Sequence, residues 1–314
     1  MRTRLAGDDS MKSEQIQKRI HSLMHELGYV FRTVSVQHLG EIETEIHSRH
    51  DAGSFDEEFF QERLTSFQFH PPESLAVGKS IIMIAVPQPT VVLIFAWRGT
   101  DHSVVIPPTY DVLVNGEVRN RLEQILQPEG YSVAATILPL KLLAVRSGLA
   151  EYGRNNICYI PSKGSFYRLM ALCTDFPRLD DHWGPAIIMK RCANCKACLK
   201  ACPAGAIGEH RFLFHAERCL TFHNERTNNF PEYVDRTWHH CLFGCLACQK
   251  ICPENKESMK WVEERERFSE EETSWILSGI SPDQVPPSTR QKLERLSLID
   301  DYLLVGRNLS LLLT

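Results

Sequence analysis

The cysteines constrain this chain of 314 residues most, because nine of its eleven cysteines lie between positions 192 and 252. Four occur within eleven residues in RCANCKACLKACPAGAI, 191–207, at spacings of two, two and three, with a proline after the fourth. About fifty residues later, an imperfect copy spaced three, two and three runs from Cys241 to Cys252 and also ends in Cys-Pro. Such runs bind cuboidal 4Fe-4S clusters in bacterial ferredoxins, where the fourth cysteine binds the other cluster. The sequence therefore predicts two neighbouring 4Fe-4S clusters.

Zinc sites and disulfides are the alternative uses of so many cysteines. Paired Cys-x2-Cys motifs also bind zinc, but a longer loop normally separates the pairs that close one four-coordinate ion. Disulfides need an oxidising compartment, whereas the N-terminus MRTRLAGDDSMKSEQ lacks the apolar segment of an export signal. Iron-sulfur binding is therefore the preferred interpretation.

The ligand count leaves one cysteine over. Two clusters of four ligands need one cysteine fewer than the nine available in this region. Cys241 opens the second copy at an irregular spacing, and Cys219, in ERCLTF, is the other candidate, so the spacing leaves this choice open. Cys158 and Cys173 lie in apolar segments outside the region and are expected to be ordinary buried thiols.

The composition is that of a soluble globular protein, with 43% hydrophobic residues, 24% charged residues and a net charge of -4. A chain of this length usually folds into about two domains. No apolar run is long enough to cross a bilayer and no secretion signal is visible, so we expect a cytoplasmic protein with no membrane partner. The small negative charge gives no support to RNA binding.

Apolar periodicity ahead of the cysteines predicts helices alternating with strands. The helices are expected at 16–27, at 118–126 and from Pro139 onward, and the strands at 80–86, 91–97 and 131–138. The two runs SIIMIAV and VVLIFAW are apolar throughout, as in strands buried on both faces. This alternation predicts an α/β fold.

These patterns divide the chain into three regions. Residues 1–175 form the α/β region, residues 176–256 form a loop-rich region ordered by metal ligation, and residues 257–314 form a C-terminal helical extension. In that extension, the charged run WVEERERFSEEETSW is expected to be a solvated helix face. The apolar LIDDYLLVGRNLSLLLT is expected to be a helix docked on the body.

The loop YGRNNICYIPSKGSF, 152–166, combines glycines with amide side chains around a short strand. Glycine permits close backbone approach, and amides both donate and accept hydrogen bonds, so the loop would suit a large polar cofactor. The alternative is a plain connection between elements.

At this point the chain resembles the cobalamin-dependent epoxyqueuosine reductases, which reduce epoxyqueuosine in tRNA to queuosine, and more distantly the reductive dehalogenases. The matching segments are PPESLAVGKSIIMIAVP, LAVRSGLAEYGRNNICYIPSKGSF, ERCLTFHNE and FGCLACQKICPEN. About 175 residues precede the first clustered cysteine, far more than a ferredoxin requires, so we expect a domain that receives the electrons.

The resemblance implies a nitroreductase-like cobalamin-binding domain, followed by a bacterial-type double 4Fe-4S ferredoxin domain and a short C-terminal helical tail. It favours Cys219 over Cys241 as a ligand. The implied ligands are Cys192, Cys195, Cys198 and Cys252 for the first cluster, and Cys202, Cys219, Cys245 and Cys248 for the second.

The resemblance also assigns positions around cobalamin. The implied cobalamin-binding residues are Gly153, Arg154, Asn155, Asn156, Ser165 and Thr221. Tyr110 and Asp111, near the family's Asp-Tyr-His segment, and Tyr152, beside the loop, are the catalytic candidates, each with a structural role as the alternative.

Two departures from the family affect substrate and mechanism. The family's general-acid aspartate falls on Thr136, whose hydroxyl is a poor proton donor. The chain ends in GRNLSLLLT, where the family's helical repeats begin, and those repeats help to hold tRNA, so tRNA is disfavoured as a partner. We expect a small molecule or modified nucleoside as substrate and a low-potential ferredoxin or flavodoxin as electron donor. The alternatives are an electron-transfer protein without cobalamin and a reductive dehalogenase-like enzyme.

Overall fold

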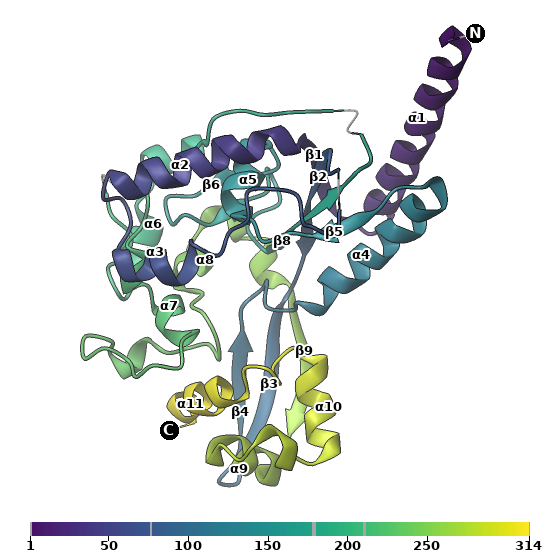
Figure 1. The fold of residues 1–314 in the computed structure, drawn as a ribbon. Helices are drawn as coiled ribbons and strands as arrows, with labels where there is room; N and C mark the ends of the chain where they lie inside the picture. The colour runs from purple at the N-terminus through teal and green to yellow at the C-terminus, as the bar shows by residue number, and fades with distance from the viewer. Residues whose placement is uncertain (1, 76, 178–179, 210–211, 314) are drawn as a thin grey trace.

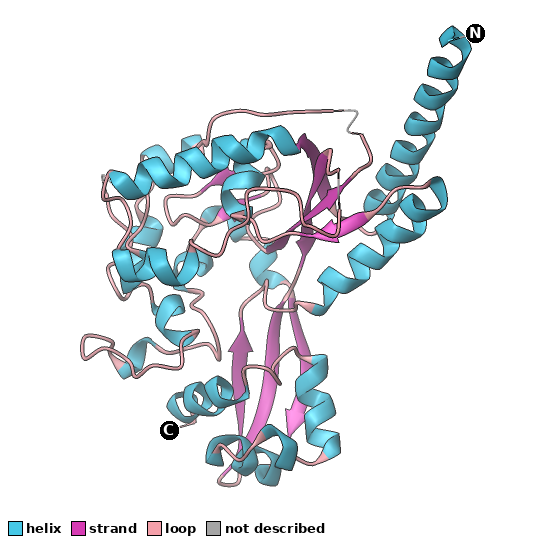
Figure 2. Cartoon of the chain, viewed as in Figure 1, coloured by secondary structure: helices cyan, strands magenta, loops and turns pink. Residues whose placement is uncertain are grey.

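The computed structural model describes residues 2–75, 77–177, 180–209 and 212–313 (Figure 1). A four-stranded antiparallel sheet forms the centre of the larger part, and the three-stranded sheet of the smaller part lies apart from it (Figure 2). The order in the larger sheet is β1 (Val30–Ser35), β2 (Ser80–Pro87), β8 (Tyr167–Thr174) and β5 (Val133–Ala135). The predicted mixed α/β class is therefore confirmed.

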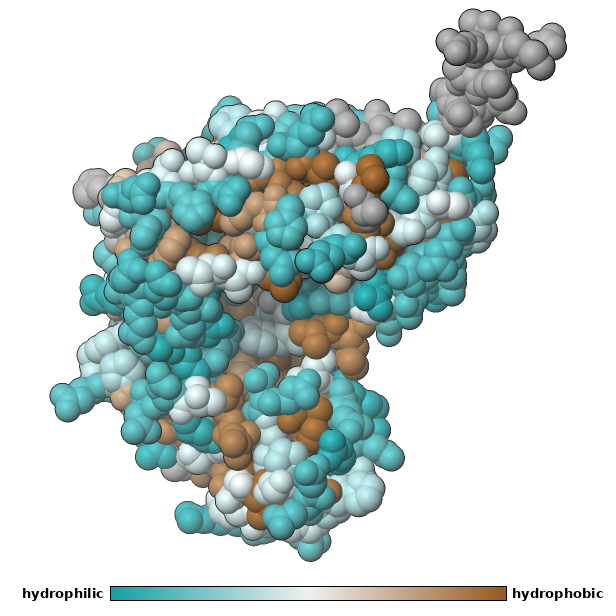
Figure 3. Space-filling view, viewed as in Figure 1, coloured by the Kyte–Doolittle hydropathy of each residue, from teal (hydrophilic) through white to brown (hydrophobic). Residues whose placement is uncertain are grey.

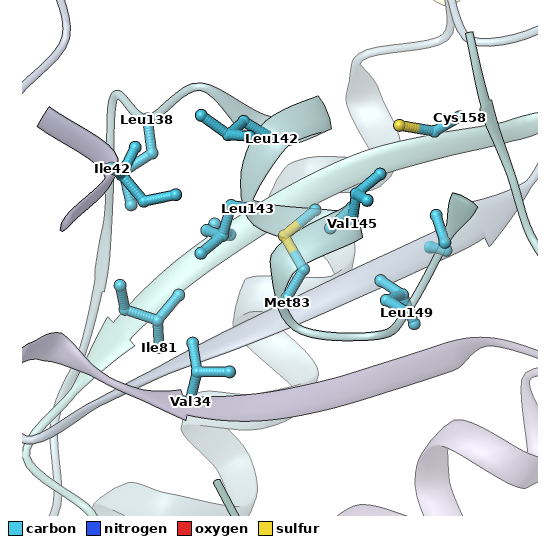
Figure 4. Packing of buried hydrophobic residues seen from close by; sticks show 14 of the residues in the cluster. Val34, Ile42, Ile81, Met83, Leu138, Leu142, Leu143, Val145, Leu149 and Cys158 are labelled. Atoms are coloured by element: carbon cyan, nitrogen blue, oxygen red, sulfur yellow. The ribbon is translucent and has the colours of Figure 1, made fainter. Parts of the chain in front are cut away.

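Strand β2 shows why this sheet carries helices on both faces. Successive strand residues point to opposite faces, and both sets are apolar here. Ile81 and Met83 pack into the cluster that includes α2 (Leu39–Asp51) and α5 (Leu140–Arg146), as Figure 4 shows. Ile82 and Ile84 pack against the opposite cluster.

The opposite face carries two helices that the periodicity predicted in part. These are α1 (Arg2–Glu26) and α4 (Leu113–Leu126). Ile16, Ile20 and Met24 of α1 are almost completely buried in the same cluster as Leu122 of α4. The expected strand at 131–138 is shorter in the structure, because only Val133–Ala135 pairs with β8.

The smaller sheet has the order β4 (Thr100–Ile106), β3 (Thr90–Trp97) and β9 (Val262–Phe268). It packs with α9 (Glu270–Ser278), α10 (Pro287–Arg295) and α11 (Tyr302–Leu312), as Figure 1 shows. The predicted docking of the apolar tail is confirmed, since Val305 and Leu309 of α11 are fully buried.

The expectation of one solvated helix across the charged run was wrong. Its first half is β9, which runs parallel to β3 and buries Phe268 against Phe95, with stacked rings 4.6 Å apart. Charged side chains cover the outer edge of β9, as is common on edge strands. Ser269 then starts α9 with a reciprocal capping box to Glu272. The run therefore divides into a strand and a helix.

In its described residues, the cysteine region has short α-helices joined by loops and 3-10 turns. They are α6 (Ala197–Ala201), α7 (Leu220–Asn224) and α8 (Ala247–Lys250), and α6 packs against α8. The region lies beside α3 (Glu57–Arg63), where Phe59 contacts Phe222 edge to face at 5.5 Å. A two-residue hairpin of β6 (Glu151–Tyr152) and β7 (Cys158–Tyr159) precedes it in the chain.

Hydrophilic residues cover most of the face in Figure 3. No helix in the described part of the chain combines the length and apolar character that a membrane crossing requires.

Candidate active site

The first cysteine quartet consists of Cys192, Cys195, Cys198 and Cys252. Burial raises the pKa of Cys198 to about 11, and repulsion from the thiolates of Cys192 and Cys252 contributes. Burial also raises the pKa of Cys192, with Cys252 and Cys195 adding to it. Such mutual effects need short separations, so the turn before α6 and the cysteine after α8 meet.

The second quartet consists of Cys202, Cys219, Cys245 and Cys248. Burial raises the pKa of Cys245 to about 12, with further increases from Cys219 and Cys202. Burial also raises the pKa of Cys248, and Cys245, Cys219 and Cys202 all add to that shift. These four cysteines therefore also lie together.

Cys241 is close to one member of this second quartet but is buried in an apolar cluster. It is 2% exposed and packs with Phe166 and Leu246. Burial raises its pKa to about 12, and the only cysteine that adds to this shift is Cys245. Of the two candidates that the spacing left open, Cys219 is the one placed beside Cys202.

The chemistry of the two quartets fits 4Fe-4S clusters. All eleven cysteines are free thiols, and each quartet draws its ligands from both cysteine turns, as the crossed ferredoxin pattern requires. Within the described residues, no three His, Cys, Asp or Glu side chains are spaced to hold a single metal ion. Cluster ligands stand around a cube instead. Tyr159 is close to members of both quartets, because Cys252 and Cys248 both add to the effect of burial in raising its pKa.

A cavity of about 710 Å³ lies against the second quartet. All four cysteines of that quartet line it, and the opposite walls come from the loop after β4, α5 and β8. Leucine, isoleucine, proline and phenylalanine side chains supply much of the lining, with a few charged and polar groups between them. This size and character are typical of a small-molecule or cofactor site.

Three of the implied cobalamin-binding residues line this cavity: Asn155, Ser165 and Thr221. The Asn155 side chain donates to the Tyr159 hydroxyl at 3.1 Å. The Ser165 hydroxyl donates to Gln249 Oε1 at 2.9 Å. The side chains of Asn155 and Ser165 are therefore held by contacts within the protein.

The other three implied residues, Gly153, Arg154 and Asn156, lie outside the cavity lining. Arg154 donates to main-chain oxygens of the first cysteine turn, at 2.6 Å to Cys192 and 3.1 Å to Cys195. The Asn156 amide donates to the Phe212 oxygen at 2.9 Å. A side chain at Gly153 would place its Cβ 2.6 Å from the Tyr159 ring. In this structure, these residues brace the cysteine region.

Of the three catalytic candidates, one lines the cavity and two lie elsewhere. Tyr110 lines the cavity. Asp111 points elsewhere: its Oδ2 pairs with Arg265 at 3.0 Å and its Oδ1 accepts the first amide of α4. Tyr152 is 7% exposed in the apolar core. Thr136 also lies outside the cavity, where its hydroxyl donates to the Ala171 oxygen at 2.9 Å.

Glu225 is a cavity residue that the sequence did not single out. It follows α7, lines the cavity and accepts a hydrogen bond on Oε1 from the Tyr110 hydroxyl. Burial raises its pKa above the usual range for glutamate. Glu225 ends the segment ERCLTFHNE, which resembles the family, but nothing in that segment distinguishes it from the other acids near the cysteines.

The two cysteine quartets beside a cavity indicate a protein with a double iron-sulfur cluster domain. Residues 191–255 match the family model of the 4Fe-4S double cluster binding domain. Within that class the chain is similar to epoxyqueuosine reductases, as the sequence predicted. It is 32% identical over 192 residues to the one from Synechococcus sp. (strain CC9605), which covers 59% of this chain and 56% of that relative.

The fold is also that of epoxyqueuosine reductases. The solved enzyme from Bacillus subtilis aligns with a TM-score of 0.64 and 20% identity, covering 96% of this chain and 82% of that one. A structure of an epoxyqueuosine reductase with a modified tRNA-Tyr stem loop aligns with a TM-score of 0.61 and 19% identity, covering 96% and 81%. The sequence alignments cover a smaller share of the relatives than the structural alignments do. They span 38% and 56% of the length of two curated relatives.

Proposed function

We propose that this protein is an iron-sulfur reductase of the epoxyqueuosine reductase type, with two 4Fe-4S clusters that pass single electrons to cobalamin in the cavity. The observation that carries this proposal is the second cysteine quartet, which forms one wall of the 710 Å³ cavity. A cluster there would lie beside whatever the cavity binds. The first quartet would then be the entry point for electrons from a low-potential ferredoxin or flavodoxin.

The proposed cluster ligands are the two quartets, with Cys219 in place of Cys241. Electrostatic coupling of Cys219 to Cys202, and the burial of Cys241 in an apolar cluster, support this choice. We assign residues 1–175 to a nitroreductase-like domain and residues 176–256 to the ferredoxin-like domain. Residues 257–314, expected as a helical extension, also contribute β9 to the sheet of β3 and β4.

Cobalamin suits the lining of the cavity by its donor chemistry and its apolar walls. Asn155, Ser165 and Thr221 offer hydrogen-bonding groups at its edge, and the apolar walls would exclude water from a bound corrin. Bound cobalamin would supply a strongly reducing cobalt centre, which is chemistry that amino acid side chains lack. The protein's own share is to orient the substrate and to hold a proton near it.

The proposed substrate is an electrophile with a reducible carbon–oxygen bond, with an epoxide-bearing nucleoside first. The similarity to epoxyqueuosine reductases supports this choice. The net charge of -4 favours a nucleoside or other small molecule over intact tRNA. Turnover of free nucleoside compared with that of the modified stem loop would decide between the two.

Metal analysis of protein prepared without oxygen tests the cofactors directly. We expect about eight iron atoms and one cobalt per chain after reconstitution with cobalamin. The corrinoid absorption should remain with the protein through gel filtration. Eight irons without retained corrinoid would point to an electron-transfer protein, and zinc in place of iron would overturn the proposal.

A further inference from the structure

A phenol and a carboxyl group meet inside the cavity. The Tyr110 hydroxyl donates to Glu225 Oε1, and no described residue donates a hydrogen bond to Glu225 Oε2. Both side chains are half-buried and both line the cavity. One carboxyl oxygen is therefore held by the protein, while the other is left for a molecule in the cavity.

The main chain next to Tyr110 is strained at Thr109, and close contacts hold the Tyr110 side chain in position. Thr109 has φ 83°, a region that β-branched residues rarely adopt. Its carbonyl oxygen accepts a hydrogen bond from Arg168, which stands on β8. Gly244, with φ 60°, lies so close to the Tyr110 hydroxyl that a side chain there would collide with it. Strain of this kind is commonly held at functional sites.

The glutamate side is anchored just as firmly. Glu225 caps α7 through a main-chain hydrogen bond to the Thr221 oxygen at 3.1 Å. The preceding Asn224 is fully buried and donates to the Gly244 oxygen at 2.7 Å. Two turns that carry cysteines of the second quartet therefore hold the main chain at Glu225 in place.

The groups around Glu225 have opposing effects on its pKa. Burial raises the pKa of Glu225, and Asp301 raises it further, whereas the Tyr110 hydrogen bond, Arg63 and Lys141 lower it. Burial raises the pKa of Tyr110 well above the usual value, with Glu225, Cys241 and Cys219 adding to the shift. The phenol therefore keeps its proton at neutral pH, and the carboxyl group keeps its own to a higher pH than an exposed glutamate does.

We propose that Glu225, positioned by Tyr110, is the proton donor to the substrate in this cavity. This inference rests on the proposed reductase function. Of the other acids on the lining, Asp300 and Asp301 are both exposed and lie on the loop before α11. Thr136, at the position of the family aspartate, is not part of the lining.

The proton balance shows what this donor must do. Converting an epoxide to an alkene breaks both carbon–oxygen bonds, takes up two electrons and two protons, and releases the oxygen as water. The electrons come from the reduced ferredoxin or flavodoxin through the clusters. Glu225 gives the first proton to the epoxide oxygen, regains a proton from solvent and gives the second. Tyr110 remains protonated, and its hydrogen bond stabilises the carboxylate after each transfer.

Glu225→Gln in the reconstituted holoprotein is the central test. Loss of a positioned acid should lower turnover of an epoxide-bearing nucleoside at least about 100-fold. Reduction of the bound corrinoid by a low-potential chemical reductant should be unchanged. In the unaltered protein, activity should fall as pH rises through the pKa of Glu225, and that alkaline limb should vanish in Glu225→Gln.

Two further variants should move the alkaline limb in opposite directions. Tyr110→Phe removes a hydrogen bond that lowers the Glu225 pKa, so the limb should shift to higher pH. Asp301→Asn removes a charge that raises the pKa, so the limb should shift to lower pH. Glu43→Gln, on the exposed face of α2, is the matched control and should leave the limb in place.

Infrared spectroscopy gives a readout that needs no turnover. In an infrared pH titration, the holoprotein should keep the band of one protonated carboxyl group to a higher pH than exposed carboxyl groups do, and this band should be missing in Glu225→Gln but present in Glu43→Gln. A band that persists in Glu225→Gln, or turnover with an unaltered pH profile, overturns the inference. Failure to retain corrinoid would count against the proposed function instead, and the infrared result would still decide the state of Glu225.

Discussion

Arg154 contacts Cys192 through both its side chain and its main chain. Its guanidinium donates to the Cys192 oxygen at 2.6 Å. Burial raises the pKa of the Cys192 thiol, and the main-chain hydrogen bond from Arg154 acts against this rise. A residue expected at the cofactor therefore organises the first cysteine turn, and the loop 152–166 connects that turn to the cavity wall.

Arg154→Ala should weaken the first cluster selectively. The side chain also donates to the Cys195 and Glu209 oxygens, at 3.1 and 2.8 Å, and hydrogen bonds from a charged group contribute about 1.5–3 kcal/mol each. We expect iron to fall from about eight towards about four atoms per chain under mild chelation. Arg119→Ala, on the exposed face of α4, is the control and should keep full iron content. Equal iron loss in both variants would contradict this role.

Serine substitutions should separate the two candidate ligands. Cys219→Ser should remove or convert the second cluster, because Cys219 stands beside Cys202. Cys241→Ser should retain about eight iron atoms, since its side chain belongs to an apolar cluster. Iron content and electron paramagnetic resonance of the reduced proteins measure both outcomes. A cluster lost in Cys241→Ser and kept in Cys219→Ser would reverse the ligand assignment.

The pairing of β9 with β3 can be tested through Phe268. Its side chain is completely buried and stacks on Phe95, so Phe268→Ala should lower the free energy of unfolding by about 4 kcal/mol. Val262→Ala, at the other end of β9 and 51% exposed, should cost less than about 0.5 kcal/mol. Denaturant unfolding followed by circular dichroism gives both values. Similar losses in the two variants would argue against a buried strand end.

The sequence predicted those features that depend on neighbours along the chain. The apolar runs around Ile82 and Leu93 became strands because burial on both faces leaves a continuous apolar pattern. Residues 262–268 gave no such signal, because charged side chains cover the exposed edge of that strand. The partner strand of β9 lies more than 150 residues earlier in the chain, and local periodicity carries no information about such pairing.

In the candidate site, too, the sequence predicted local features but not contacts between distant residues. The cysteine turns could be predicted because ligand spacing within one turn is local. Tyr110 and Glu225 are 115 positions apart and meet only in the folded chain. Asp111 is adjacent to Tyr110 in sequence, yet its carboxylate turns to Arg265 outside the cavity. The direction of a side chain at a strained loop is set by tertiary contacts, which sequence patterns do not reveal.

Arg307 of α11 should be a major contributor to the stability of the segment that carries Glu225. Its guanidinium donates to main-chain oxygens of four residues, namely His223, Asn224, Arg226 and Asn228. Arg307→Ala should therefore lower the free energy of unfolding by about 3 kcal/mol. It should also speed amide hydrogen exchange in residues 223–229. Arg307→Lys should be intermediate, because an ammonium group lacks the planar fork that reaches several carbonyls.

Arg295→Ala provides the matched control for this prediction. Arg295 lies on α10 and pairs with Glu266 at 2.8 Å, with 58% of its side chain exposed. An exposed pair contributes at most about 1 kcal/mol, so this variant should leave exchange in residues 223–229 unchanged. If Arg307→Ala and Arg295→Ala unfold at the same denaturant concentration with the same exchange pattern, α11 does not brace the acidic side of the cavity.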